Sequence, residues 1–122
     1  MATLLVNVGK ALVTGFILGG GATEPHHVAL GVGTGTTAAT DTTLFTEAES
    51  RVVGTSTQQT VTTTNDTYQV VGTITATAAR VVKNAGLFTD ASAGTLFVKG
   101  DFSDINLAIG DSIQFTIKCT FS

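Results

Sequence analysis

The sequence predicts a mainly β fold: an antiparallel β-sandwich or barrel-like meander with a short N-terminal helix or arm. Composition is the first indication, because 24 Thr and 14 Gly stand against 15 charged residues in a chain of 122, unlike the balance of helical proteins. The others are a strictly alternating C-terminal run and a series of short β-prone runs separated by turn residues. A domain of this length has a modest core, so association with other chains is a natural source of stability.

The N-terminal segment, residues 8–18, is predicted to be a short helix. Apolar side chains recur four residues apart, as in Leu12 and Phe16, and Asn7 stands in front as a candidate cap. An edge strand is the alternative, because Gly15 and several β-branched residues disfavour a helix.

Three consecutive glycines, residues 19–21, predict a hinge or a helix terminator, because glycine imposes no backbone conformation of its own. The chain therefore divides into an N-terminal helix or arm with its glycine hinge, residues 1–21, and a single β domain, residues 22–122.

Residues 27–33 alternate enough to predict a strand, and the small, polar residues 34–41 that follow predict a loop. After the loop we expect a single helical turn capped by Asp41. Its Leu44 and Phe45 would then reach back to the core.

Two longer β-prone runs, residues 51–64 and 67–79, are separated by Asn65 and Asp66, which favour a hairpin turn. The first run is polar on both faces, so it is predicted to be exposed and weakly registered unless a neighbouring chain packs on it. In the second run the even-numbered residues 68–76 share one, more apolar, face.

Three further strands complete the prediction. Residues 80–89 and 95–102 are joined by a turn at 90–94, and a second turn at 106–111 leads into the last strand. Period-two alternation is clearest in this last strand. The residues expected to point one way are Ile113, Phe115, Ile117, Cys119 and Phe121.

No constellation of side chains predicts catalysis, and we expect a protein that is not an enzyme. His26 and His27 are the only histidines; as neighbours at a strand entrance they are expected to point to opposite faces and not to share a metal. Cys119 has no partner for a disulfide and lies on the apolar face, where thiols are usually inert.

Two further motifs are assigned structural roles. The glycine-rich stretch 31–35 lacks the strand–helix context of a phosphate-binding loop, so its glycines are predicted to let the chain pass close to a neighbouring backbone. An acidic cluster matches no calcium loop and is predicted to supply turn and capping hydrogen bonds. Its members are Asp101, Asp104, Asn106 and Asp111. We therefore expect no catalytic residues, no metal and no cofactor.

The charge balance argues against nucleic acid as a direct partner. The net charge is −3 and the six Lys and Arg are scattered along the chain, whereas phosphate backbones are bound by clustered basic residues. The most apolar stretch, residues 11–18, is about half of the roughly 20 residues that span a bilayer, and no basic segment of a signal peptide precedes it. We expect no membrane partner.

The succession of five stretches resembles small structural proteins of tailed bacteriophages. They hold 38 of the 122 residues and run from one end of the chain to the other. The stretches are NVGKALV (7–13), LGVGTGTTAATDT (30–42), NAGLF (84–88), GTLFV (94–98) and GDSIQFTI (110–117). Proteins of this kind occur as capsid cement (decoration) subunits or as tail and fibre components.

The resemblance implies a non-enzymatic virion protein that is made in the host cytoplasm and assembles, often as a homotrimer, on the outer surface of the capsid. Its partners would be the major capsid protein and further copies of itself. One short domain without a coiled-coil shaft or a repeat favours a cement subunit over a fibre.

Intersubunit contacts are expected from the N-terminal segment and from the polar run 51–64. The candidate residues are Leu12, Phe16, Ile17, Thr57, Thr60 and Thr62. Two alternatives remain: a phage tail, baseplate or fibre component, and a carbohydrate-binding β-sandwich module. The scarcity of aromatic residues disfavours the second, because sugar-binding modules present aromatic platforms.

Overall fold

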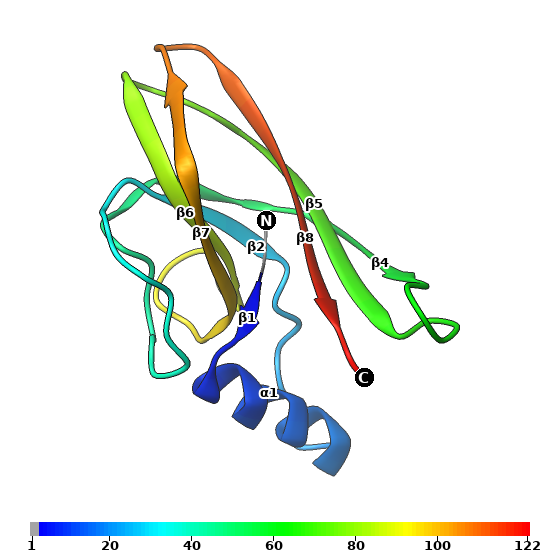
Figure 1. Cartoon of the computed structure of the whole chain (residues 1–122). Helices are drawn as coiled ribbons and strands as arrows, with labels where there is room; N and C mark the ends of the chain where they lie inside the picture. Colours follow the sequence, from blue (N-terminus) through cyan, green and yellow to red (C-terminus); the bar gives the residue numbers. More distant parts are fainter. Residues whose placement is uncertain (1–2) are drawn as a thin grey trace.

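The computed structural model describes residues 3–122 and contains two antiparallel sheets with one short N-terminal helix (Figure 1). Strands take up 48% of the chain and helix 10%, which confirms the predicted mainly β class. The elements are β1 (Leu4–Leu5), α1 (Asn7–Leu18), β2 (His27–Gly31), β3 (Glu47–Val53), β4 (Thr55–Gln59), β5 (Thr67–Thr75), β6 (Arg80–Phe88), β7 (Leu96–Leu107) and β8 (Ser112–Thr120).

The two sheets form the layers of a sandwich. The larger has the strand order β1-β7-β6-β2-β3 and the smaller the order β4-β5-β8. Side chains from both sheets meet in one buried cluster, with Val28 and Leu30 from β2, Val70 and Ile74 from β5, and Ile117 from β8. The core lies between the layers, because each strand turns its apolar face inward.

The polar run predicted at 51–64 is two strands that belong to different sheets. The chain leaves the larger sheet at the end of β3 and enters the smaller one at β4, with Gly54 alone between them. A Cβ on Gly54 would lie 2.3 Å from Cγ1 of Val70, so only glycine fits at this corner. The run begins earlier than predicted and ends at Gln59, where a turn replaces the strand.

The predicted N-terminal helix is confirmed as α1, which packs against β7. The capping role expected for Asn7 is wrong, because the N-cap residue is Val6 and no side chain caps this end. Instead the backbone N–H of Asn7 donates to the carbonyl of Ala39 over 2.8 Å. Gly9 permits close contact, since a Cβ there would lie 2.1 Å from the carbonyl oxygen of Phe97.

The helical turn predicted after Asp41 is wrong, and residues 41–46 are irregular. Its backbone groups are held by side chains from the sheet: Lys99 donates to the carbonyl of Thr43, and Asn84 bonds both peptide groups of Phe45. Peptide groups bound in this way are not available for helical hydrogen bonds.

The glycine-rich stretch behaves as predicted. A Cβ on Gly31 would lie 2.5 Å from the carbonyl oxygen of Phe45, and one on Gly33 would lie 2.9 Å from the carbonyl carbon of the same residue. Strand β2 and the loop after it therefore pass directly against the backbone of Phe45, an approach that any side chain would block.

The C-terminal half follows the prediction with two corrections. Strand β7 continues to Leu107, so the turn before β8 is shorter than expected, and the Asp111 carboxylate accepts the N–H of Ala108 over 2.8 Å. Along β8 the inward face is confirmed from Ile113 to Cys119. Phe121 lies beyond the strand and is 45% exposed, so it does not belong to the core face.

Candidate assembly surface

The exposed end of α1 carries the most solvent-accessible large apolar side chains of the described residues. Phe16 is 43% exposed, Ile17 82% and Leu18 84%. Phe121, from the C-terminal segment, is 45% exposed and lines the same groove as Phe16. We call these four residues the apolar patch. Single exposed apolar residues are common on proteins, but a contiguous group marks an interaction site.

The helix does not need these side chains in order to end where it does. Gly19 adopts the left-handed conformation with φ of 75° and donates its N–H to the carbonyl of Phe16, while Gly20 donates to the carbonyl of Gly15. This pair of bonds is a Schellman motif, which satisfies the last carbonyls through the backbone alone. The helix end therefore does not depend on the side chains of Ile17 and Leu18.

A groove of about 250 Å³ runs along one side of the apolar patch. It lies between the helix, the segment before β2 and the C-terminal segment. Its lining residues are Val13, Phe16, Glu24, Pro25, Tyr68, Phe97 and Phe121. The groove is an apolar depression next to exposed apolar side chains, a combination that suits a protein side chain from a partner.

The polar edge of the groove is fixed by Tyr68. Its hydroxyl donates to the Glu24 carboxylate over 3.1 Å and to the Pro25 carbonyl over 3.2 Å. Burial, aided by the Glu24 charge, raises the pKa of Tyr68, so the phenol stays a donor. The hydrogen bond from Ser56 holds the pKa of Glu24 below its usual range, which leaves one carboxylate at the rim.

Phe121 connects the apolar patch with the turn between β4 and β5. Its N–H donates to the Asp66 carbonyl over 2.9 Å. Phe121 also lines a small hollow beside this turn, together with Gln58 and Asn65. Helix α1, this turn and the C-terminus lie at the same end of the molecule (Figure 1). Three segments far apart in the sequence are thus brought to one end of the molecule.

The turn itself, residues 60–66, is organised by Asp66. Its carboxylate accepts three consecutive backbone N–H groups, those of Val61, Thr62 and Thr63, at 2.8–2.9 Å. These bonds hold the pKa of Asp66 well below its usual range. An ordered turn of this kind presents its threonines in fixed positions.

Five of the six expected contact residues lie on the surface. Phe16 and Ile17 belong to the apolar patch, and Thr57, Thr60 and Thr62 are exposed on β4 and on the turn. Leu12 is half-buried and packs against the core. The sequence prediction missed two members of the patch, Leu18 and Phe121. Leu18 could have been included because it directly precedes the glycines that end the helix.

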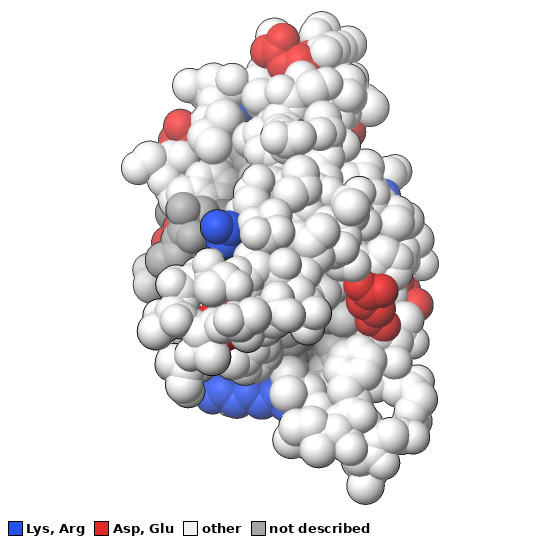
Figure 2. Space-filling view, turned by 90° about the vertical axis from the view of Figure 1, so that its right-hand side faces the viewer, with Lys and Arg blue, Asp and Glu red and all other residues white. Residues whose placement is uncertain are grey.

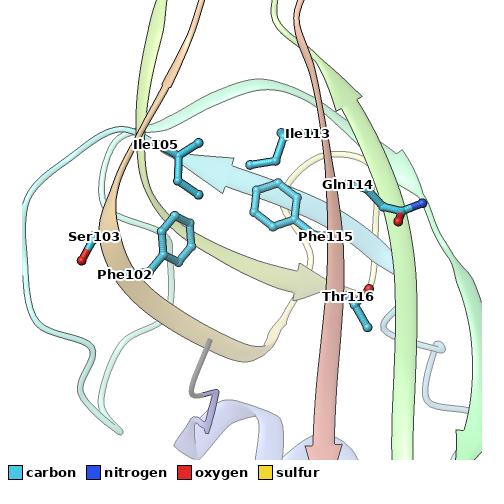
Figure 3. A pocket seen from close by; sticks show the side chains of 7 residues that line it. All are labelled: Phe102, Ser103, Ile105, Ile113, Gln114, Phe115 and Thr116. Carbon is cyan, nitrogen blue, oxygen red and sulfur yellow. The ribbon is translucent and has the colours of Figure 1, made fainter.

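Away from the apolar patch, an apolar hollow of about 630 Å³ lies between β7 and β8, at the open edge of the sandwich. Figure 3 shows Phe102 and Ile105 on β7 facing Ile113 and Phe115 on β8. Beyond its short pairing with β1, this edge of β7 pairs with no described strand, and β8 pairs only with β5. Phe115 is 6% exposed and Ile105 38%, so the side chains that line this hollow are less exposed than Ile17 and Leu18 of the apolar patch.

One side of the molecule, which faces the viewer in Figure 2, carries few charged groups. Figure 2 shows the side that lies on the right in Figure 1, and most of its atoms belong to uncharged residues. The chain has only 15 charged residues in total. Few charges need to be desolvated when such a surface is covered, which favours apolar and hydrogen-bonded contacts with another protein.

The histidines lie closer together than expected. The ring centroids of His26 and His27 are 4.8 Å apart, because His26 precedes β2 and does not follow the alternation of the strand. His26 contacts the Glu24 carbonyl through Nδ1 over 2.9 Å. Within residues 3–122 no three metal-ligating side chains come together.

The aspartates of the acidic cluster each have a different hydrogen-bond or ion-pair partner. Asp104 pairs with Lys83, Asp111 caps the turn before β8, and Asp101 accepts the N–H of Thr37 over 2.9 Å. The predicted turn and capping role is confirmed for Asp111.

Comparison with protein-family models, with curated proteins and with solved structures found no match. In the part of the chain that the structure describes, no helix is long and apolar enough to cross a membrane.

Proposed function

We propose that the chain is a non-enzymatic structural protein of a bacteriophage particle. In this proposal it is a cement subunit that forms homotrimers on the outer surface of the capsid and bridges copies of the major capsid protein. The particle and the partner come from the resemblance of five sequence stretches to small phage structural proteins. Assembly as the mode of action is supported by the surface of the molecule.

The observation that carries the proposal is the apolar patch. With exposed fractions of 43%, 82%, 84% and 45%, and taking roughly 150–250 Å² for a large side chain, its four residues present on the order of 500 Å² of apolar surface. A stable interface takes about 800 Å² from each partner, with an apolar centre and a polar rim. The patch matches such a centre, and the threonines of β4 and the following turn match a rim.

The internal architecture fits a part that bears load. The loop after β2 is fastened to the sheet by Asn84 and Lys99, and the turn after β4 by Asp66. Side-chain anchors that bind backbone groups limit the movement of loops. A subunit that bridges others in a shell needs loops that keep their shape.

Binding to capsid shells tests the proposal. Purified protein is mixed with shells of a phage that encodes this chain, assembled without it, and the mixture is sedimented. We expect saturable binding at a fixed ratio to the major capsid protein and shells that withstand higher temperature. Labelling of the tail in intact particles, with no binding to shells, would assign the chain to the tail instead and overturn the cement proposal.

A further inference from the structure

We propose that Lys99 and Asp41 join through an amide bond between their side chains. This inference concerns the interior of the domain and does not depend on the proposed function. Among residues 3–122, Lys99 is the one charged residue that is completely buried, with no accessible surface. Its Nζ lies 2.9 Å from Oδ2 of Asp41, which is 58 positions away in the sequence.

The amine of Lys99 is held in one position. It donates to the Thr43 carbonyl over 3.0 Å and lies 3.2 Å from the centroid of the Phe45 ring. These contacts fix the end of a normally flexible side chain and keep water away from the amine. The nucleophile and the carboxyl group therefore meet without loss of further conformational freedom.

Burial supplies a driving force. An ion pair in a dry interior is costly, because desolvation of two charges offsets much of their attraction. The amide carries no charge and keeps the two segments together. Asp41 retains 20% side-chain exposure, so the water that is released has a path to solvent.

A second carboxylate, that of Asp101, is bound by the same loop as Asp41. Asp101 lies two residues from Lys99 on β7, which places both side chains on one face of the strand. Consecutive backbone N–H groups bind the two carboxylates: Thr37 donates to Asp101 and Ala38 to Asp41. The loop therefore binds both acids, and among residues 3–122 Asp41 is the one whose carboxylate pairs with the Lys99 amine.

The reaction is a condensation that needs no oxidant and no cofactor. The Lys99 ammonium gives one proton across the 2.9 Å contact to the Asp41 carboxylate, and the resulting neutral amine attacks Cγ of the Asp41 carboxylic acid. The bond from Nζ to Cγ forms and one bond from Cγ to oxygen breaks. That oxygen leaves as water with the proton that it received from the ammonium and a second proton from the nitrogen.

The starting state is ionic, which makes the condensation slow. The Ala38 N–H, aided by Lys99, holds the pKa of Asp41 below its usual range. We therefore expect the bond to accumulate after folding. It would fasten the irregular segment 41–46 to β7 covalently.

Intact-mass spectrometry of the denatured protein tests the inference. The folded wild type, after several days at 37 °C, is expected to have the mass of its chain less one water, and proteolysis should give a branched peptide joining Lys99 to Asp41. The matched control Lys99→Arg keeps the positive charge but forms no amide, so it should keep its full mass.

The wild-type measurement decides by itself, so a variant that folds poorly does not affect the outcome. A folded wild type that keeps the full mass of its chain would overturn the inference and leave Lys99 and Asp41 as an ion pair. A water loss that persists in Lys99→Arg would also overturn it, because the loss would then arise elsewhere.

Discussion

The side-chain amide of Asn84 pairs with both peptide groups of Phe45. Its Oδ1 accepts the Phe45 N–H over 3.1 Å, and its Nδ2 donates to the Phe45 carbonyl over 3.2 Å and to the Gly33 carbonyl over 3.2 Å. Asn84 is completely buried in the middle of β6. One side chain thus takes the place of a neighbouring strand for a segment that has no regular structure.

Replacement of Asn84 by Ala is expected to cost about 3 kcal/mol of unfolding free energy, because it leaves buried backbone groups without partners. Urea unfolding measured by circular dichroism checks this value. The matched control is Asn106→Ala on the exposed part of β7, where a change below about 0.5 kcal/mol is expected. Equal effects at the two positions would contradict the role assigned to Asn84.

Gly31→Ala should be more damaging than its size suggests. The added Cβ would lie 2.4 Å from Oδ1 of Asn84 and 2.5 Å from the Phe45 carbonyl oxygen, so either the strand or the loop must move. We expect a loss of several kcal/mol or failure to fold. At Gly20 the same change meets only one atom, at 3.6 Å, and should be tolerated. Thermal unfolding of both variants provides the comparison.

Acid should destabilise the fold partly through Glu49. Its side chain is 3% exposed. A hydrogen bond from Arg80, supported by one from the backbone N–H of Thr77, holds the pKa of Glu49 below its usual range. A carboxyl group with a lowered pKa contributes stability above its unfolded value of about 4.3, and this contribution disappears as the pH falls through the folded pKa.

In Glu49→Gln the unfolding free energy should therefore be lower than that of the wild type at pH 7, and the difference should shrink as the pH is lowered from about 5 towards 2. Denaturant titrations across this range measure it. Asp104→Asn, which removes an exposed ion pair, serves as the control and should shift the whole curve by less than about 1 kcal/mol. A constant difference between Glu49→Gln and wild type would contradict the assignment.

Cys119 should be unreactive in the folded protein. It is buried on the inner face of β8, and this burial raises the pKa of its thiol, so little thiolate is present or accessible. Reaction with a thiol reagent should occur only as fast as the domain unfolds. The control is a cysteine at the exposed neighbouring position, Thr120→Cys in a Cys119→Ala background, which should react at once. Rapid labelling of Cys119 itself would contradict the packing described.

Local patterns in the sequence were enough to predict the class of fold, the helix and most strands. The alternation of β8 and the apolar spacing in α1 are local properties, and each follows from the period of its element. The close approach at residues 31–35 was also predictable, because only glycine serves that purpose. These are cases in which local preference and final structure agree.

Long-range side-chain anchors were not predictable. Asn84 and Lys99 lie in strands where polar residues normally face solvent, and nothing near them in the sequence indicates partners at Phe45 or Asp41. For the same reason the segment after Asp41 was wrongly predicted as a helical turn. The apolar patch was found in part, since Phe16 and Ile17 are neighbours on a helix, whereas Phe121 reaches it only through the fold.

The native mass in solution tests the central claim most directly, that this chain works by assembling through the apolar patch. Sedimentation equilibrium of the wild type should give a trimer, about three times the chain mass of 12.4 kDa. The variant Ile17→Ser with Leu18→Ser should fold with unchanged stability and sediment as a monomer. Val53→Ser with Ile109→Ser removes two side chains of comparable exposure elsewhere and should remain a trimer. A wild type that stays monomeric at all concentrations, or a patch variant that stays trimeric, would contradict the account.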